Sequence, residues 1–392
     1  MRVVIVTESF PPDVNGVAHC AQQTARHLVR RGHDPLVIAP AVPGSGPSAA
    51  GATPGAVECG PATAPAGDEL PCPVVRVPSL PLPGYPQVRV ALPSRRVAHT
   101  IAAHRADIVH LASPFVLGVR GMTAATRLGL PAVAVYQTDL AGYARTYVGA
   151  GEGAAWRRLR AVHGAADRTL APSSAAVRDL ETHGVGRVRL WRRGVDTDRF
   201  RPVLRDEALR RELAPGGELL VGYVGRLAPE KRVELLAGVC GLPGVRVVVV
   251  GDGPSEPGLR AALPGAMFLG RRTGSDLARI FASLDVFAHT GPYETFCQTV
   301  QEAMASGVPV VAPAAGGPLD LVDHRRTGLL VPPGEATAMR DAIASLAAAP
   351  TLRASYGTAG RAAVEGRTWE AVGDELIGHY REVLRERTAV AA

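Results

Sequence analysis

The chain has 392 residues, 46% of them hydrophobic, which suits two domains of about 190 residues, each with its own core. No apolar run approaches the ~18 residues of a membrane-spanning helix, and no helix-turn-helix, zinc-finger or RNA-binding signature accompanies the net charge of +7, so nucleic acid is not an expected partner. Residues 1–190 hold 19 Arg and 12 Asp plus Glu, whereas residues 191–392 hold 24 cationic and 24 acidic residues, so the excess positive charge lies on the first half. Either this half faces an anionic membrane or an acidic acceptor, or the charge merely reflects an Arg-rich composition.

The amino-terminal residues and the cysteines predict the cell compartment. Arg2 is followed by only four apolar residues before Thr7, the pattern of a first strand and not of a signal peptide. The cysteines are odd in number, scattered and without a Cys-x-x-Cys pair, at positions 20, 59, 72, 240 and 297. We therefore expect a cytoplasmic protein without structural zinc, which could also lie peripherally at the inner membrane face.

Strands and helices alternate along the first half, the pattern of a parallel sheet. Gly16 follows the first strand and its loop and opens a helix that stops at Gly32. The loop lacks Gly-x-Gly-x-x-Gly, so a dinucleotide fingerprint is unsupported, but a glycine at a helix start lets the backbone approach a phosphate closely. Buried strands are predicted at 1–6, 36–40, 74–77, 107–111, 132–136, 168–172 and 188–191.

Three segments of the first half differ from this alternation. Residues 41–73 are almost entirely Ala, Gly, Pro, Ser and Thr and are predicted to be a flexible insertion. Residues 78–86 are proline-rich and predict a loop that either lines an acceptor pocket or covers the sheet. A basic helix with Arg95, Arg96 and His99 follows, either at a membrane surface or simply solvated.

Polar residues end two of the predicted strands. His110 closes one strand, and Gln137 and Asp139 follow the next. Because the carboxyl ends of parallel strands share one edge of the sheet, these residues are expected at the same edge as Gly16, where α/β proteins bind ligands. A histidine in this place is either a hydrogen-bonded structural residue or a functional one.

The second half repeats the pattern, with strands predicted at 219–224, 245–250 and 267–270 and helices beyond 330. A glycine-led loop at 225–232, expected to lead into a helix, carries Arg226 and Lys231. Of the 43 cationic residues only Lys231 is a lysine, which suggests a position that requires a compact ammonium group. The two cations predict a clamp for phosphates, with an ordinary surface loop as the alternative.

A helix between two buried strands, 284–288 and 308–313, follows His289. Its first turn is expected at Phe296, Cys297, Gln298 and Thr299, at the carboxyl edge of the sheet. The amides of that turn and the positive end of the helix dipole favour an anion such as a diphosphate.

Two glutamates flank this helix start. Glu294 precedes the helix and Glu302 is expected about two turns into it, roughly 10 Å away, which matches the reach from the sugar to the ribose of a nucleotide-sugar. Carboxylates accept paired hydroxyl donors well. In the alternative interpretation, Glu294 caps the helix and Glu302 is a solvated surface residue. The neighbouring glycines, Gly307 and Gly316-Gly317, argue against this alternative.

The segments GRLAPEK, GDGP and ETFCQTVQEAMASGVPVVAP together resemble the GT-B fold retaining glycosyltransferases of family 4, over nearly the whole chain. SLPLPGYPQVRVALP, VHLASP and YQTD are similar to segments of the bacterial GDP-mannose-dependent α-mannosyltransferases. The resemblance implies an α/β fold with two Rossmann-like parallel-sheet domains facing a central cleft. Residues 1–190 would bind the acceptor, residues 191–370 the donor, and a final helix at 371–392 would pack back on the first domain.

The resemblance also implies an activity. It is the retaining, metal-independent transfer of a hexose, with GDP-mannose as the first-choice donor, to a hydroxyl of a lipid, glycan or small natural product. Arg226 and Lys231 would bind the diphosphate and stabilise the leaving group. The remaining donor contacts would come from Glu294 and the backbone of Phe296, Cys297 and Gln298 for the sugar, Thr299 for the phosphates, Glu302 for the ribose, and Gly16 for the diphosphate from the other domain.

The chain departs from the family pattern at the acceptor side. Many relatives have a histidine where this chain has Gln137, and a second one where it has Ala112, so His110, Gln137 and Asp139 are predicted only as the wall near the sugar. Asp196-Thr197-Asp198 spells the Asp-x-Asp of some metal-dependent glycosyltransferases, but it lies at the domain crossing and is predicted to be a turn and cap.

Three alternative functions remain open from the sequence. The first is the same fold with a UDP-sugar donor, either glucose or N-acetylglucosamine. The second is a nucleotide-binding oxidoreductase, against which the missing glycine fingerprint argues. The third is a catalytically silent protein that binds a sugar nucleotide.

Overall fold

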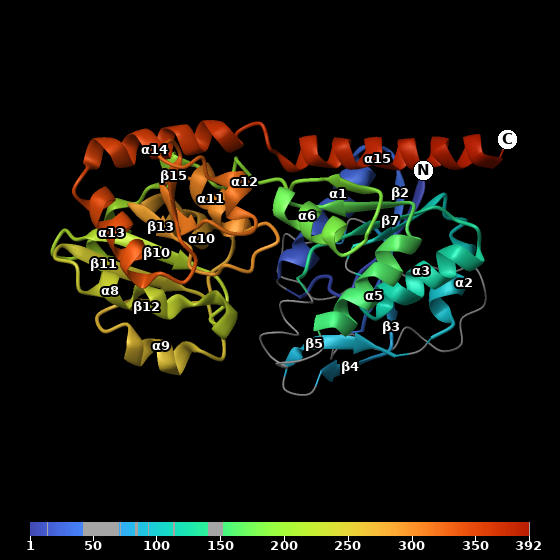
Figure 1. Ribbon diagram of the computed structural model, residues 1–392, viewed down its shortest axis with the longest axis horizontal. Helices are drawn as coiled ribbons and strands as arrows, with labels where there is room; N and C mark the ends of the chain where they lie inside the picture. The colour runs from blue at the N-terminus through green and yellow to red at the C-terminus, as the bar shows by residue number, and fades with distance from the viewer. Residues whose placement is uncertain are drawn as a thin grey trace. The chain divides into compact units, whose positions relative to one another are not determined.

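The computed structural model describes residues 1–13, 15–41, 70, 72–82, 85–92, 94–112, 114–139 and 152–391. The chain forms two compact units (Figure 1). Unit 1 comprises Met1–Pro172, Val177–Trp191 and Val372–Ala392, and unit 2 comprises Ser173–Ala176 and Arg192–Ala371. Most of the predicted insertion at 41–73, with Cys59, lies outside the described residues.

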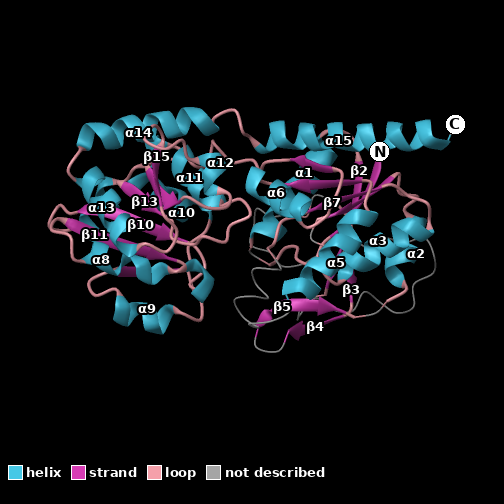
Figure 2. Ribbon diagram, viewed as in Figure 1, coloured by secondary structure: helices cyan, strands magenta, loops and turns pink. Residues whose placement is uncertain are grey.

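Unit 1 is built on a seven-stranded parallel sheet in the order β3-β2-β1-β6-β7-β8-β9. Its strands are β1 Arg2–Val6, β2 Asp34–Pro40, β3 Val74–Val77, β6 Ile108–Leu111, β7 Ala132–Val135, β8 Arg168–Ala171 and β9 Val188–Leu190. Its helices are α1 Gly16–Arg30, α2 Arg96–Ala103, α3 Leu117–Arg127, α5 Glu152–Ala165, α6 Ser174–Thr182, which begins in unit 2, and α15 Trp369–Ala391. Helices α1 and α15 cover one face of the sheet and α2, α3 and α5 the other (Figure 2), so the strands are buried on both faces and consist of continuous apolar runs.

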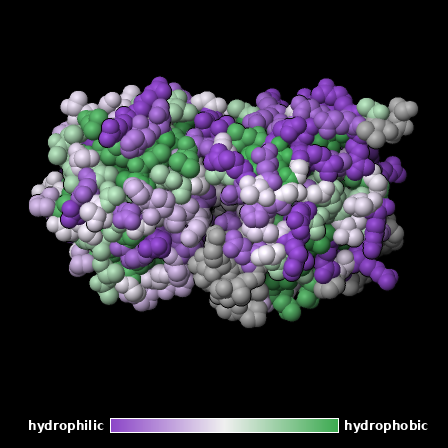
Figure 3. Space-filling model, in the orientation of Figure 1, coloured by the Kyte–Doolittle hydropathy of each residue, from purple (hydrophilic) through white to green (hydrophobic). Residues whose placement is uncertain are grey.

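Most of the last helix, α15, belongs to unit 1. Its inner side carries Tyr380, fully buried, while its outer surface is hydrophilic (Figure 3). Charged groups fix it in place: buried Arg168 of β8 pairs with Glu382 and, at 2.7 Å, with Glu386. The indole of Trp191 donates a hydrogen bond of 3.0 Å to the carbonyl of Val372.

The proline-rich segment expected to be a loop is partly a hairpin. Strands β4 (Ser79–Leu82) and β5 (Tyr85–Ala91) pair antiparallel in a separate two-stranded sheet. The prolines suggested a loop because they cannot donate to a strand ladder, but a two-stranded sheet has outer edges where no donor is needed.

Unit 2 has a six-stranded parallel sheet in the order β12-β11-β10-β13-β14-β15. Its strands are β10 Leu219–Val224, β11 Val245–Val250, β12 Met267–Gly270, β13 Val286–Ala288, β14 Val310–Pro313 and β15 Gly328–Val331. Its α-helices are α7 Glu207–Leu213, α8 Ala237–Cys240, α9 Glu256–Ala262, α10 Gly274–Ser283, α11 Gln298–Ala305, α12 Pro318–Leu321, α13 Ala336–Ala347 and α14 Pro350–Val364, with 3-10 turns at Pro202–Leu204, Pro229–Lys231 and Val233–Leu236. Two Rossmann-like parallel sheets are thus confirmed.

The strand order reverses once in each sheet. In unit 2 the chain passes outward through β10, β11 and β12 and then returns to start again at β13, beside β10. In parallel sheets, ligands commonly bind at such a point, at the carboxyl ends of the two strands, here β10 and β13. In unit 1 the same point lies between β1 and β6.

Two local expectations were wrong. The loop at 225–232 leads into 3-10 turns and the short helix α8, because Arg232 has a left-handed backbone, with φ 53°, which interrupts a helix. Helix α11 begins only at Gln298, since Cys297 before it is also left-handed, with φ 79°. Glu302 therefore lies about one turn into the helix and not two.

Candidate functional site

The two loops at the switch point of unit 2 meet through a pair of opposite charges. Nζ of Lys231, from the loop after β10, lies 2.5 Å from Oε1 of Glu294, from the loop after β13. The hydroxyl of Thr290 donates to the carbonyl of Lys231 at 2.6 Å, which joins the two loops a second time. Both charged side chains are only about one-sixth exposed, at 18% and 17%, so water screens the pair weakly.

The loop that carries Lys231 rests on the GDGP segment after β11. Leu227 donates its amide to the carbonyl of Asp252 at 2.8 Å. A β-carbon on Gly251 would lie 1.9 Å from the carbonyl oxygen of Gly225, and one on Gly253 would lie 2.2 Å from that of Leu227. Only glycine allows the two backbones to approach so closely, so the GDGP segment packs directly against the loop that carries Lys231.

Arg226 lies at the entrance to the same loop. Its guanidinium is 3.4 Å from the buried carboxylate of Glu230 and is 32% exposed. The hydroxyl of the fully buried Tyr223 donates to the carbonyl of Arg226 at 3.1 Å. The guanidinium thus remains accessible to an anion while its backbone is fixed.

A pair of glycines fixes the loop that carries Glu294. The amide of Gly317 donates to the carbonyl of Glu294 at 2.8 Å. A β-carbon on Gly316 would lie 2.4 Å from the Glu294 carbonyl oxygen, and one on Gly317 would lie 2.0 Å from that of Phe296. The loop after β14 therefore holds the Glu294 loop by backbone contact.

The environment of Glu294 favours its charged form. Burial raises the pKa of Glu294, but the charges of Lys231 and His289 and the hydrogen bond from Lys231 lower it by more, so the net pKa is below its usual value. The side chain is therefore a carboxylate at neutral pH, able to accept hydrogen bonds from sugar hydroxyls.

His289 is a part of this centre to which the sequence analysis gave no role. Its side chain is 3% exposed. Nε2 donates to the carbonyl of Gly291 at 3.0 Å and lies 3.4 Å from Oε1 of Glu294. Burial lowers the pKa of His289 to about 4, although Glu294 opposes this, so the ring is neutral. Its place at the carboxyl end of β13 was the only signal in the sequence.

Cys297 is also close to this centre. Its thiol is 3.8 Å from the hydroxyl of Thr299. Burial and the negative charge of Glu294 raise its pKa well above the usual value, so it is a thiol. Single ligand atoms of His289, Glu294 and Cys297 all lie within 4.8 Å of one another.

Helix α11 is hydrogen-bonded to the segment where the chain enters unit 2. The side-chain amide of Gln298 donates to the carbonyl of Gly194 at 3.0 Å, and that of Gln301 donates to the carbonyl of Arg193 at 3.2 Å. The ring of Phe296 is 1% exposed and anchors the turn before the helix in the core. The start of α11 is thus held rigidly at the sheet edge.

Glu302 differs from Glu294 in its protonation state. Burial raises the pKa of Glu302 to about 8. The Arg199 guanidinium lowers this pKa, and the Asp196 carboxylate raises it by a smaller amount. Asp196 caps a turn by accepting from the amide of Arg199 at 2.9 Å, as predicted for the Asp-x-Asp sequence. That turn is distant from the phosphate loops in sequence, but its charges act on Glu302.

The predicted residues of unit 1 lie at or near the carboxyl edge of its own sheet. Gly16 begins α1, whose next two amides, of Val17 and Ala18, donate to the Asn15 side chain at 3.0 and 2.9 Å. The side-chain amide of Gln137 donates to the carbonyl of Ala112. Asp139 accepts a hydrogen bond of 3.4 Å from the hydroxyl of Tyr136.

His110 is enclosed in the core of unit 1. It is 1% exposed, its Nδ1 lies 2.7 Å from the hydroxyl of Tyr380 on α15, and burial lowers its pKa to about 3. This ring connects the sheet to the last helix, and its contribution to an acceptor site stays a prediction.

Glu8, in the loop after β1, was not singled out by the sequence. Its Oε1 accepts from the amides of Phe115 and Gly118 at 3.2 and 3.0 Å, at the start of α3. Burial raises the pKa of Glu8 to about 7 against the opposing effect of these amides. Glu8 lies close to α3 because the strand order of the sheet places β1 beside β6.

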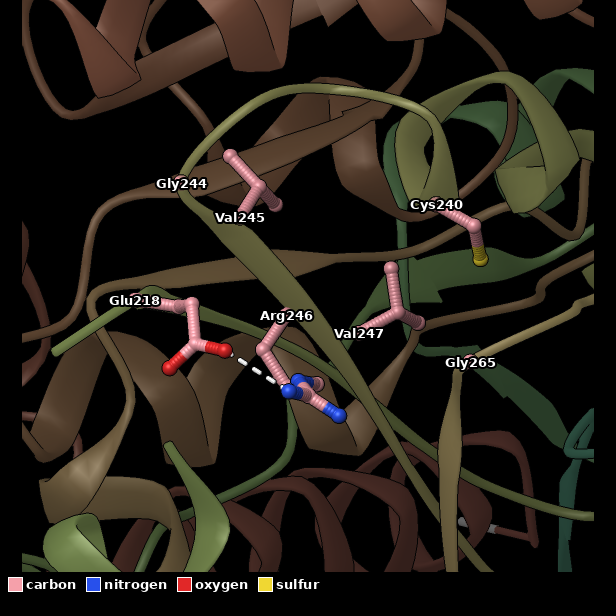
Figure 4. A pocket seen from close by; sticks show the side chains of 7 residues that line it. All are labelled: Glu218, Cys240, Gly244, Val245, Arg246, Val247 and Gly265. Atoms are coloured by element: carbon pink, nitrogen blue, oxygen red, sulfur yellow. Dashed lines mark hydrogen bonds and ion pairs between the residues drawn. The ribbon is translucent and has the colours of Figure 1, made fainter. Parts of the chain in front are cut away.

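A pocket at the opposite edge of the unit 2 sheet is chemically different. It is lined by Cys240 and by residues that precede or begin β10, β11 and β12 (Figure 4). Glu218 and Arg246 form an ion pair of 2.7 Å across it, and thus neutralise each other. The amino ends of the strands lack the helix starts that favour an anion.

Comparison with known proteins agrees with this arrangement. Residues 14–199 match Glycosyltransferase Family 4, and residues 205–363 match the glycosyl transferases group 1. A GDP-mannose-dependent alpha-mannosyltransferase of Mycobacterium tuberculosis (strain CDC 1551 / Oshkosh) is 47% identical over all of this chain and 99% of its own. Its namesake in Corynebacterium glutamicum is 41% identical over 98% of this chain and 89% of its own.

The solved structure of Anabaena HepE in complex with UDP is similar in fold. It superimposes with a TM-score of 0.76 at 21% identity, covering 97% of this chain and all of that chain. Together these matches define the class, glycosyltransferases of the GT-B fold. The chain belongs to Glycosyltransferase Family 4, as the sequence motifs predicted.

Proposed function

We propose that this protein transfers an α-mannosyl group from GDP-mannose, with retention, to a hydroxyl of a lipid, a glycan or a small natural product. The observation that carries the proposal is the 47% identity, over the whole chain, to a protein named for that donor. The UDP-sugar alternative has weaker support, because the likeness to the UDP complex is at 21% identity and concerns the fold alone.

Lys231 and Arg226 would bind the donor diphosphate. Two cations on one glycine-supported loop, beside the start of α11, provide the concentrated positive charge that a leaving diphosphate needs. Because Lys231 contacts Glu294 at 2.5 Å, the group that stabilises the leaving phosphate is adjacent to the group proposed to hold the sugar. Thr299 would add a hydroxyl to the phosphates.

Glu294 and the backbone of Phe296, Cys297 and Gln298 would hold the sugar, and Glu302 the ribose. The lowered pKa of Glu294 supports a role as hydrogen-bond acceptor for sugar hydroxyls. Gly16, and the acceptor-side residues His110, Gln137 and Asp139, keep the roles expected from the family. We also propose that transfer needs no metal, because Lys231 and Arg226 already supply positive charge. Activity undiminished by a chelator would support this, and activity restored only by a divalent ion would contradict it.

A thermal-shift panel of GDP, UDP, ADP and dTDP tests the donor. A nucleotide at 100 times its dissociation constant should stabilise the protein by ~2.7 kcal/mol, and we expect GDP to act at the lowest concentration. Release of mannose from GDP-mannose, and its transfer to added acceptors, then tests catalysis with Lys231→Ala as the inactive control. Stronger stabilisation by UDP would favour the alternative donor, and binding without hydrolysis or transfer would indicate a silent sugar-nucleotide-binding protein.

We further propose that unit 1 contacts an anionic membrane from the cytoplasmic side. Among the described helices, none is both long and apolar enough to cross a bilayer. Apolar surface gathers at the lower edge of unit 1 over the β4–β5 hairpin, where Leu80 is 57% exposed (Figure 3). Leu92, 37% exposed, and the exposed Arg95 and Arg96 follow in the chain, a combination of apolar and basic groups typical of interfacial binding.

Sedimentation with lipid vesicles tests this membrane contact. We expect the full-length protein to bind vesicles that contain phosphatidylglycerol and not pure phosphatidylcholine. Leu80→Ser and Arg95→Glu should each reduce the bound fraction, whereas Arg326→Glu, at a side chain 77% exposed on unit 2, should not. Equal binding to both vesicle types would contradict the proposal.

A further inference from the structure

Three side chains that commonly bind metal ions meet beside Lys231. His289 directly follows β13, Glu294 lies in the same loop, and Cys297 precedes α11. One ligand atom from each lies within 4.8 Å of the others. The residues belong to one short segment fixed by the glycine pair after β14. Their mutual position is therefore set by the fold and not by flexible surface side chains.

Cys297 stands where its backbone conformation is unfavourable for a side chain. Its φ of 79° and ψ of 73° are in the left-handed region, where glycine is unstrained and a cysteine costs energy. Strained residues of this kind concentrate at ligand sites. The cysteine therefore brings a thiol to this point at a cost to stability.

His289 supplies the second observation. The side chain is 3% exposed, and its Nδ1 is enclosed and forms no hydrogen bond with any described residue. A buried imidazole usually satisfies both nitrogens. The nitrogen that lies 3.4 Å from Glu294 is Nε2, which donates its proton to Gly291. If that proton moves to Nδ1, Nε2 becomes free to bind a metal ion in place of its contact with Gly291.

The ligand set selects a class of ion. Thiolate, imidazole and carboxylate together suit zinc and its thiophilic relatives such as cadmium. Zinc bonds of about 2.0–2.3 Å place neighbouring ligand atoms of a tetrahedral site roughly 3.5 Å apart. Atoms that now lie within 4.8 Å of one another therefore need to approach by up to about 1.3 Å. The thiol proton would leave to solvent as the metal–sulfur bond forms.

We propose that His289, Glu294 and Cys297 form an inhibitory site for a thiophilic divalent cation, and that the bound ion and the donor sugar nucleotide exclude each other. The ion would take the carboxylate of Glu294, which now contacts Lys231 at 2.5 Å, and the two cations cannot share that oxygen without strong repulsion. Only the exclusion of the donor rests on the proposed function. Binding of the ion rests on geometry alone.

Cadmium titration of the full-length protein tests the site. Cadmium bound to thiolate gives an ultraviolet charge-transfer band, which we expect to saturate at one equivalent in the wild type. The band should persist in Cys240→Ser, which removes a partly exposed thiol in the same unit, outside the cluster. Cys297→Ser and Cys297→Gly should lose it, with binding at least about 100-fold weaker, and glycine relieves the backbone strain so that folding is preserved. A saturable band that survives in both Cys297 variants, or that is absent from the wild type, would overturn the proposal.

A second measurement tests the exclusion. Zinc should raise the apparent dissociation constant of GDP-mannose in the wild type, and GDP-mannose should weaken cadmium binding by the same factor. In Cys297→Gly the donor affinity should not respond to zinc, which controls for chelation by the diphosphate. An equal response in that variant would refute the exclusion. Cadmium binding without any donor binding would refute the proposed function while leaving the metal site intact.

Discussion

Glu294 and Glu302 lie on one loop-and-helix segment, yet their surroundings set opposite protonation states. The Lys231 ammonium keeps the pKa of Glu294 below its usual value even though burial raises it, whereas burial raises the pKa of Glu302 to about 8. At neutral pH one is a carboxylate and the other is mostly a neutral acid. Two equivalent glutamates in the sequence are therefore different groups in the folded protein.

Glu302 should make stability depend on pH. Its carboxyl ionises near 4.5 in the unfolded chain and near 8 in the folded one, so between these values only the folded state keeps the proton. The resulting contribution is complete below the unfolded pKa and is lost as pH rises through the folded pKa, at up to ~1.4 kcal/mol per pH unit. In urea unfolding between about pH 5 and 8, Glu302→Gln should remove this part of the slope and leave the part due to Glu8, whose pKa is raised by burial to about 7. Glu335→Gln, at an exposed position, should retain it, and an unchanged slope in Glu302→Gln would show that the site is not desolvated.

Lys231 and Glu294 should be strongly coupled in stability. Either single change, Lys231→Met or Glu294→Gln, removes one charge and leaves the other poorly solvated, whereas the double variant removes both. A double-mutant cycle should therefore give a coupling of about 2 kcal/mol. The pair Arg232 and Glu234, 2.6 Å apart but 43% and 47% exposed, is the matched control and should give less than about 1 kcal/mol. Similar couplings for both pairs would mean that solvent screens the site as it does the surface.

At the scale of elements, the loop after β14 should control the position of the Glu294 loop. Gly317→Ala would place a β-carbon 2.0 Å from the carbonyl oxygen of Phe296, so one loop must move. We expect a loss of about 2 kcal/mol in unfolding free energy and weaker binding of the donor. Gly258→Ala, in α9 with nothing within 4 Å of the new atom, is the control and should be neutral or stabilising. Normal donor affinity in Gly317→Ala would separate the glycine contact from the site.

The sequence predicted the elements whose pattern is local. Strands β10, β11 and β12 have the predicted bounds. For β10 and β11 the reason is that short runs rich in Val and Leu suit a sheet buried on both faces. The β4–β5 hairpin was missed since prolines normally interrupt strands. The late start of α11 was missed because the left-handed backbone of Cys297 has no signature in a residue that is not glycine.

The site was predictable to the same extent. Lys231 was visible as the one lysine, and Glu294 through its place before a helix, and the structure brings these two into contact. The role of His289 depends on burial of its ring against Gly291, and the effect of Asp196 on Glu302 depends on how the chain enters unit 2. Both effects arise from tertiary packing and therefore cannot be predicted from the spacing of residues along the chain.

At the scale of the whole molecule, each of the two units has apolar clusters of its own among the described residues. One cluster is confined to residues between Val4 and Ala166, and two others lie between Val195 and Val364. The chain passes between units at Trp191–Arg192 and at Ala371–Val372, and twice more around the short segment Ser173–Ala176. Units that each have their own apolar clusters are expected to open separately.

Hydrogen exchange with and without GDP should reveal this independence. Of the proposed nucleotide contacts, Arg226, Lys231 and Glu302 lie in unit 2 and only Gly16 lies in unit 1. GDP at 100 times its dissociation constant should therefore stabilise chiefly unit 2, by ~2.7 kcal/mol. Amides of β10 and β13, which exchange only when unit 2 opens, should slow about 100-fold, whereas those of β1 and β6 in unit 1 should change little. Lys231→Ala should abolish the slowing at the same GDP concentration. Equal slowing in both sheets would instead mean that α15 and the crossings join the units into one cooperative structure.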